Sequence, residues 1–234
     1  MTAFFYHNNK RIVQSFHGKK KLFIILLPAL TISLATFFLT RYYSVKKEVT
    51  VYFPDEIDLA LAEYPVRGDP NAPVTIIELC DFECPYSKAL QPTLDTLHDY
   101  LQGVIKHYFK PQIIFTGKEK RFRARAVLAA KRQGKYWEMK KALFSIDLDK
   151  KNKSFKKSIL PEIIKKAKEC NLDIQTFQKD FHSREISREL RSIIVESDKY
   201  GIDFVPTLFI NGKIIQGKHG FEDYLDIIEK ALAE

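Results

Sequence analysis

The sequence predicts an α/β domain in which a mixed sheet carries an inserted block of helices. A near-continuous apolar run, Val74–Cys80, leads directly into a helical pattern. Several helical patterns then occupy the middle of the chain, and two short apolar runs joined by Asn211-Gly212 follow near its end. The chain has 234 residues, of which 45% are apolar, and this suits one globular domain with an appendage.

The first strand and the helix after it are expected to form the centre of the domain. The run Val74–Cys80 is typical of a strand that is buried on both faces, and turn residues precede it at Gly68–Pro73. A helix is expected from about Lys88 to Leu101, and Pro92 inside it should kink it, because proline lacks the N–H donor. A second strand is expected at Val104–Phe109, and the helix before it supplies the crossover that parallel strands need.

The rest of the domain is predicted to be an insert of helices, a hairpin and a last helix. The insert helices are expected at Phe122–Arg132, Tyr136–Phe144, Ile159–Glu169, Ile174–Phe181 and Glu185–Tyr200. Thr207–Ile210 and Lys213–Gln216 are expected to pair, since Asn-Gly between two apolar runs is a strong hairpin signal. Phe221–Leu232 has the apolar spacing of an amphipathic helix.

The N-terminal part of the chain has the pattern of a membrane signal anchor. The uncharged run Leu22–Thr40 is just long enough to cross a bilayer, which needs about 20 apolar residues. Basic residues are in excess before it, so the positive-inside rule places residues 1–21 in the cytosol as a basic tail. Residues 41–65 are expected to be a spacer with a short strand at Val49–Phe53, and residues 66–234 to be the domain.

A cleaved signal peptide is the alternative for the same segment. Ser33-x-Ala35 has the small residues of a cleavage site. The apolar run continues past Ala35 to Leu39, and the basic region before it is long, which favours an uncleaved anchor. In both cases the bulk of the chain reaches an extracytoplasmic space in which disulfides can form.

Charge and cysteine content exclude several other classes. The formal net charge is +9, but the lysines are scattered and belong to no nucleic-acid-binding motif, so no nucleic-acid partner is predicted. The three cysteines, Cys80, Cys84 and Cys170, do not make a structural disulfide framework. No Cys/His cluster has metal-ligand spacing, and the sequence predicts neither a metal site nor a cofactor.

Cys84 is the candidate nucleophile of this chain. It stands where a strand gives way to a helix, so the unpaired N–H groups and the dipole of the helix start favour a thiolate. The usual redox site of this kind is Cys-x-x-Cys, but the fourth position here is Ser87. Two readings of Ser87 stay open: it donates a hydrogen bond to the Cys84 thiolate, or it simply caps the helix start.

Several ordered motifs resemble one known family. The stretches are Val66–Gly68, Ala72–Val74, Asp81–Tyr86, Gln133–Met139 and Val205–Lys213. Together they resemble the DsbA-like thioredoxin-fold proteins of bacterial envelopes, over most of the chain from Val66 onward. The resemblance implies a thioredoxin fold with an inserted helical subdomain at about residues 117–200, and thiol–disulfide chemistry on exported proteins. Ser87 departs from the family, which usually has its resolving cysteine at this position.

The resemblance also implies roles for individual residues. It carries over Cys84 as the nucleophile and Pro206 as a cis-proline beside it. A cis-proline exposes neighbouring backbone groups with which an extended substrate can pair, so Val205 and Thr207 are substrate-binding candidates. Pro85 belongs with them as a residue adjoining the nucleophile.

Two more residues are expected near the nucleophile. Tyr86 is expected to shape an apolar rim around Cys84. Glu78 lies six residues before Cys84, where thioredoxin-like proteins often keep a buried acid that accepts a proton during thiol release. The other reading of Glu78 is a solvated strand glutamate.

Cys80 leaves two interpretations open. It lies four residues before Cys84 at the expected strand end, so a Cys80–Cys84 pair would restore dithiol chemistry. The simpler interpretation, which we favour from the sequence, is a small buried apolar residue. Cys170, on an insert helix, is expected to be structural.

The function predicted from the sequence is a membrane-anchored monothiol disulfide isomerase, in the bacterial inner membrane with its catalytic domain in the periplasm. Its partners would be exported cysteine-containing proteins and a membrane or periplasmic thiol reductant. The alternative is a redox-silent chaperone or adaptor that binds unfolded exported proteins. Transfer to or from a glutathione-like small thiol is a third reading.

Overall fold

The computed structural model describes residues 61–114, 121–146 and 159–233. The chain divides into two units, Met1–Val49 and Thr50–Glu234, and every described residue belongs to the second. The predicted anchor at Leu22–Thr40 and the predicted strand at Val49–Phe53 lie outside the described residues. Within them, no helix is both long and apolar enough to cross a membrane.

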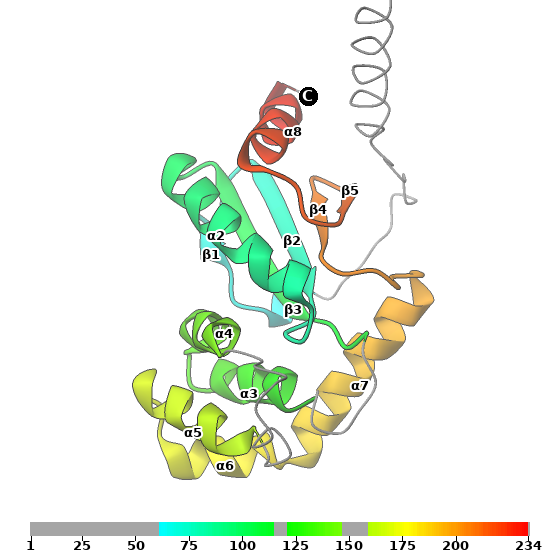
Figure 1. Ribbon diagram of the computed structural model, residues 1–234. Helices are drawn as coiled ribbons and strands as arrows, with labels where there is room; N and C mark the ends of the chain where they lie inside the picture. The colour runs from blue at the N-terminus through cyan, green and yellow to red at the C-terminus, as the bar shows by residue number, and fades with distance from the viewer. Residues whose placement is uncertain (1–60, 115–120, 147–158, 234) are drawn as a thin grey trace, which may run out of the picture. The chain divides into compact units, whose positions relative to one another are not determined.

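A mixed sheet of five strands, in the order β1-β3-β2-β4-β5, forms the centre of the described domain (Figure 1). The strands are β1 (Arg67–Gly68), β2 (Val74–Cys80), β3 (Ile105–Pro111), β4 (Thr207–Ile210) and β5 (Lys213–Gln216). β2 and β3 run parallel, while the other three pairings are antiparallel. β2 is the central strand. Its face with Val74, Ile76, Glu78 and Cys80 is buried, whereas on the other face Leu79 is buried and Thr75 and Ile77 are partly exposed, so the prediction of a strand buried on both faces holds fully only at its C-terminal end.

Two helices cover one face of this sheet. α2 (Pro85–Tyr100) follows β2 and makes the crossover to β3. α8 (Phe221–Ala233) packs against α2 and against β2 and β4. Ile76, Cys80, Leu90 and Tyr224 belong to the large core that includes this contact. Leu79 belongs to a second, smaller core, which also contains Ile202, Phe209 of β4 and Ile214 of β5.

The inserted helices lie between β3 and β4 in the sequence. They are α3 (Arg121–Lys131), α4 (Tyr136–Ser145), α5 (Leu160–Glu169), α6 (Ile174–Phe181) and α7 (Arg184–Lys199). Helices α3 to α6 group together beyond the end of the sheet, and α7 runs back from them towards β4 (Figure 1). Asp173 and Ser183 start α6 and α7, and each side chain accepts a hydrogen bond from the backbone N–H three residues ahead.

The predicted α/β architecture is confirmed, with small shifts at element ends. The hairpin forms at Asn211-Gly212, whose φ angles of 45° and 82° are the positive pair that a tight hairpin turn requires. α2 continues through Pro92 from Pro85 to Tyr100. The sequence missed β1 (Arg67–Gly68), because Gly68 opens the stretch that was read as a turn. Gly68 has a φ of 95°, and a Cβ there would lie 2.2 Å from the Ile105 carbonyl oxygen, so only glycine fits.

Candidate active site

The chain turns sharply between β2 and α2, and this turn places Cys84. The N–H of Cys84 donates to the carbonyl of Asp81 at 3.0 Å, which closes the turn. Cys84 is the N-cap residue of α2 in an extended conformation, and Pro85 occupies the first turn of the helix, where its missing N–H costs nothing. No side chain caps the helix start, so its N–H groups remain directed at the space around the Cys84 sulfur.

The Cys84 thiol faces the loop before β4. Its Sγ lies 3.6 Å from the carbonyl oxygen of Val205, to which it donates, and the Val205–Pro206 peptide bond is cis, as the resemblance implied. Cys84 exposes only 4% of its surface, which is less than is usual for a reactive thiol. The disulfide of a substrate can therefore reach the Cys84 sulfur only through the small part of it that the neighbouring residues leave exposed.

Two exposed aromatic residues adjoin in sequence the two residues that meet here, Cys84 and Val205. Tyr86, two residues after Cys84, exposes 64% of its surface, and Phe204, just before Val205, exposes 49%. Exposed aromatic side chains can supply apolar contact area to a partner where they gather at one place. Tyr86 lies where the sequence placed it, whereas Phe204 was missed, because nothing in the linear sequence ties it to Cys84.

The turn is held from both sides by buried charged groups that the sequence did not reveal as site residues. The carboxylate of Asp81 accepts from the N–H of Glu83 at 2.9 Å and from that of Ile114 at 3.0 Å. From α3, the buried guanidinium of Arg123 donates to the carbonyl of Phe82 at 3.1 Å, and its Nε lies 3.5 Å from Glu83. Burial lowers the pKa of Arg123 from its ordinary value. The inserted helices thus support the active-site turn directly.

Ser87 and Cys80 lie next to each other in the core, on the two elements that the active-site turn joins. Ser87 is fully buried, and its hydroxyl has no regular hydrogen-bond partner among the described residues, so it does not cap the helix. The thiol of Cys80, also fully buried, is its neighbour and is within reach of the Glu78 carboxylate as well. Both Cys80 and Cys84 are free thiols in this structure. Burial raises the pKa of Cys80 well above its ordinary value, and the charge of Glu78 adds to the rise.

Glu78 is fully buried, which excludes the solvated alternative. Lys140 of α4 donates to its Oε2 at 2.5 Å, and Gln91 of α2 donates to its Oε1 at 2.7 Å. His107 Nε2 of β3 lies 3.0 Å from Oε2. Burial alone would raise the pKa of Glu78, but the Lys140 charge and the His107 contact outweigh it and hold the pKa below the usual range. Glu78 is therefore a carboxylate, which makes it a weak proton acceptor.

A histidine pair extends this network to the edge of α2. His98 Nε2 and His107 Nδ1 are 2.9 Å apart, and the two rings stack. Burial lowers the pKa of His107 to about 4 and that of His98 to about 3, so both are neutral at pH 7. We assign the Nε2 proton of His107 to the Glu78 side and let Nδ1 accept from His98, because a carboxylate can only accept.

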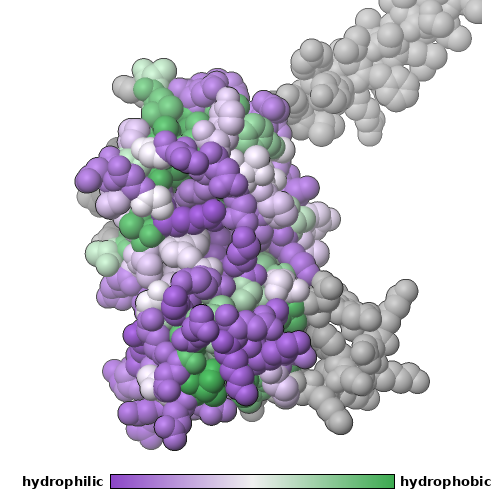
Figure 2. Space-filling view, turned by 90° about the vertical axis from the view of Figure 1, so that its left-hand side faces the viewer, coloured by the Kyte–Doolittle hydropathy of each residue, from purple (hydrophilic) through white to green (hydrophobic). Residues whose placement is uncertain are grey.

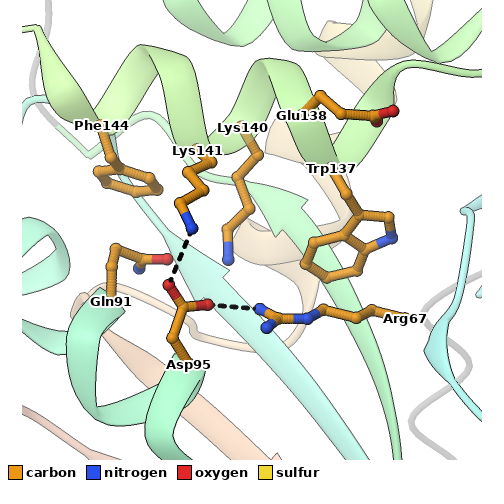
Figure 3. Close-up of a pocket in the computed structure, with 8 residues that line it drawn as sticks. All are labelled: Arg67, Gln91, Asp95, Trp137, Glu138, Lys140, Lys141 and Phe144. Atoms are coloured by element: carbon orange, nitrogen blue, oxygen red, sulfur yellow. Dashed lines mark hydrogen bonds and ion pairs between the residues drawn. The ribbon is translucent and has the colours of Figure 1, made fainter. Parts of the chain in front are cut away.

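A pocket of about 250 Å³ opens beside this network between α2 and α4 (Figure 3). Asp95 of α2 lines it, with its carboxylate 2.7 Å from Arg67 and 3.7 Å from Lys141. Gln91 and Lys140, which hold Glu78, also line the pocket. The remaining lining residues are Trp137, Glu138 and Phe144.

Two predicted residues lie away from the open side of the site. Thr207 is buried, and its hydroxyl donates to the carbonyl of Phe204 at 2.8 Å, so its side chain does not face a substrate. Any contact of Thr207 with a substrate would therefore use its backbone, as the expectation for the residues beside the cis-proline has it, and this stays a prediction. Cys170 ends α5 in the insert and is partly exposed.

Residues 62–230 match the family model described as thioredoxin. The chain belongs to the thioredoxin family. Among solved structures, the thioredoxin domain is similar to BdbD from Bacillus subtilis, with 21% identity, a TM-score of 0.66, and coverage of 80% of this chain and 99% of that one. This likeness confirms the predicted thioredoxin fold.

Two sequence relatives differ in how much of them the thioredoxin domain covers. A probable disulfide bond formation protein D of Bacillus anthracis is 25% identical over 170 residues, which are 70% of this chain and 76% of that protein. The Na(+)/H(+) antiporter NhaA 1 of Mycolicibacterium gilvum is 28% identical over 155 residues, 65% of this chain. The chain spans only about a quarter of that antiporter's length.

Proposed function

We propose that this protein is a thiol:disulfide interchange protein that acts on exported proteins through mixed disulfides on Cys84. The observation that carries the proposal is the placement of Cys84 at an uncapped helix start, against the Val205 carbonyl. A sulfur at a helix start, next to a backbone carbonyl, is the setting in which exchange-active cysteines are found. The similarity to a probable disulfide bond formation protein supports the same chemistry.

The most specific form of the proposal is a disulfide isomerase. The Cys84 thiolate attacks a non-native disulfide of the substrate, forms a mixed disulfide and releases a substrate thiolate. Position 87 carries a hydroxyl, which cannot displace the substrate by forming a second disulfide. The released substrate thiolate then attacks the mixed disulfide or another disulfide, so the substrate leaves with a rearranged pairing and Cys84 returns to its reduced form.

Substrate contact is assigned to the rim of Tyr86, Pro85 and Phe204. All three are exposed and two are aromatic; Pro85 and Tyr86 follow Cys84 in the sequence, and Phe204 precedes Val205, whose carbonyl meets the thiol. Val205 contributes its backbone carbonyl, which is released when the Cys84 thiol turns towards a substrate. Apolar segments around the cysteines of an incompletely folded protein suit such a rim, because they are exposed only before folding ends.

We further propose that Leu22–Thr40 anchors the domain on the outer side of a bacterial inner membrane. The apolar length of that run and the basic excess before it support the anchor and its direction. A thiol reductant of the membrane or periplasm would keep Cys84 reduced there. The presence of this domain's relatives within antiporters is compatible with work at a membrane.

A refolding assay with scrambled ribonuclease tests the isomerase. The wild-type chain should restore ribonuclease activity, Cys84→Ala should abolish this effect, and Cys170→Ser should leave it unchanged. Equal activity of the wild type and Cys84→Ala would refute the proposal.

A redox-silent chaperone is the second candidate, and the near burial of Cys84 beside an exposed aromatic rim favours it. In that case Cys84→Ala would still suppress aggregation of a reduced, unfolded protein. Replacing both Tyr86 and Phe204 by Ser would remove this suppression. Suppression without any covalent adduct on Cys84 would identify this function.

A further inference from the structure

We propose that Cys80 is a second, delayed thiol of this site, which releases substrates trapped on Cys84 by forming a Cys80–Cys84 disulfide. The inference rests on the proposed thiol–disulfide exchange at Cys84 and adds a residue to it. It explains how a site with serine in the resolving position avoids remaining blocked by a substrate whose own thiolate does not return.

The fold brings the two cysteines to the same corner. Cys80 is the last residue of β2, and the tight turn closed by the Cys84 N–H and the Asp81 carbonyl folds the chain back beside it. Ser87 lies three residues into α2 from Cys84, so the two share one helix face. The Cys80 thiol adjoins the Ser87 hydroxyl. The thiol therefore lies under the position that a resolving cysteine would occupy.

The Ser87 hydroxyl provides an independent observation. It is fully buried and makes no hydrogen bond of regular geometry among the described residues, and the polar group beside it is the Cys80 thiol. A buried hydroxyl whose neighbour is only a weakly bonding thiol is costly and calls for a reason. Directed at Cys80, it can donate to the thiolate that forms there during attack. The Lys140 ammonium, which holds Glu78, also favours that thiolate.

The groups around Cys80 make its attack slow but not prohibited. Burial and the carboxylate of Glu78 raise the pKa of Cys80, while Lys140 and Ser87 act in the opposite direction. Only a small fraction of the thiol is ionised at pH 7, and only the thiolate attacks a disulfide. A substrate thiolate near the mixed disulfide therefore has time to react first, and Cys80 acts on adducts that persist.

The step balances without another oxidant. The sulfur of Cys80 attacks the Cys84 sulfur of the mixed disulfide, a Cys80–Cys84 bond forms, and the Cys84–substrate bond breaks. The Cys80 proton goes to the leaving substrate thiolate. The enzyme has gained the disulfide and the substrate has been reduced by two electrons. A dithiol reductant then returns both cysteines to the free state. Cys84 must turn from the Val205 carbonyl towards Ser87 for this bond to form, since disulfides need Cβ atoms about 4 Å apart.

The test uses the full chain carrying Cys170→Ser and the chromogenic disulfide 5,5′-dithiobis(2-nitrobenzoate). Attack by Cys84 releases one thionitrobenzoate and leaves the other on Cys84. With Cys80 present, a second, slower equivalent should appear, and peptide mapping should find the Cys80–Cys84 linkage. Cys80→Ala and Cys80→Ser, each in the same background, should stop at one equivalent with a stable adduct. Ser87→Ala should slow the second release about tenfold, because one hydrogen bond to the thiolate is lost.

The outcomes separate this proposal from the one on which it rests. A single equivalent with a lasting Cys84 adduct while Cys80 is present refutes the delayed thiol but leaves exchange at Cys84 intact. The proposal is also refuted if both Cys80 variants release a second equivalent as fast as the protein that keeps Cys80. Absence of the first equivalent, in folded protein at pH 7, refutes both proposals.

Discussion

At the scale of single residues, the buried carboxylate of Glu78 decides the character of the site. Its partners Gln91, His107 and Lys140 come from α2, β3 and α4. Lys140 pairs with the carboxylate and keeps it ionised, so Glu78 is a poor proton acceptor. Its main effect on the site is that its negative charge raises the pKa of Cys80. The sequence placed a buried acid here through the family resemblance, but no spacing rule joins position 78 to position 140.

The Glu78–Lys140 pair predicts a large loss of stability when one partner is removed. Lys140→Met should lower the free energy of unfolding by about 3–5 kcal/mol, because it leaves a buried carboxylate without its cation. Lys141→Met is the matched control: its ammonium is exposed, and the change should stay within about 0.5 kcal/mol. Urea unfolding measures both. Adding Glu78→Gln to Lys140→Met should recover part of the loss, and a double variant less stable than Lys140→Met would contradict the pairing.

The histidine pair predicts a loss of stability in mild acid. The native pKa values of about 3 for His98 and about 4 for His107 lie below the ordinary 6.5. Between pH 6.5 and pH 4 the unfolded chain therefore binds more protons than the native one, so the free energy of unfolding falls as the pH falls. The urea midpoint should decrease from pH 7 to pH 5, and His98→Gln should reduce this decrease. Identical midpoints at pH 7 and pH 5 in the wild type would contradict the assignment.

At the scale of elements, α3 acts on the site although it lies in the insert. It carries Arg123 to the turn before Cys84, where the guanidinium supports the Phe82 carbonyl and approaches Glu83. Burying a guanidinium is costly, and here the cost is offset by its contacts with the turn that carries the nucleophile. The physical link from the insert to the site is this one side chain, together with Lys140 from α4.

Replacing Arg123 should therefore change the reactivity of Cys84. Arg123→Met takes the donor away from the buried Phe82 carbonyl and removes the ion pair with Glu83, and should lower stability by about 2–3 kcal/mol. The rate of Cys84 alkylation by iodoacetamide in folded protein should change severalfold, because the turn is no longer held. Arg121→Met, at the exposed start of the same helix, is the control and should alter neither property. An unchanged alkylation rate in Arg123→Met would show that α3 does not position the turn.

The elements that could be predicted are those whose signals are local. β2 follows from one apolar run and the hairpin from Asn211-Gly212, since each depends on neighbouring residues alone. The cis bond before Pro206 followed from the family resemblance and not from composition. Arg123 could not be linked to Phe82, because burial of a polar side chain is decided by packing between distant segments. The same holds for Ser87, whose missing partner is visible only in three dimensions.

At the scale of the whole molecule, charge and location are linked. The chain carries a formal net charge of +9. Hydrophilic residues are spread over the visible face of the described domain, and apolar residues form small patches between them (Figure 2). The lysines behind this charge are scattered along the sequence and belong to no nucleic-acid-binding motif. The chemistry proposed for Cys84 instead requires a compartment in which disulfides form and persist.

That requirement fixes the direction of the predicted anchor. Alkaline phosphatase fused after Glu234 should be active, because this reporter folds only where its own disulfides form. Changing Lys19, Lys20 and Lys21 to Gln should lower its activity, since those charges hold the N-terminus in the cytosol. The same change at Lys46 and Lys47 removes positive charge from the other flank, so it should leave the activity intact. An inactive fusion to the unaltered chain would place Cys84 in a reducing compartment and remove the basis for exchange on exported proteins. If the fusion is active but the protein is found cut after Ala35, the location holds and the uncleaved anchor is excluded.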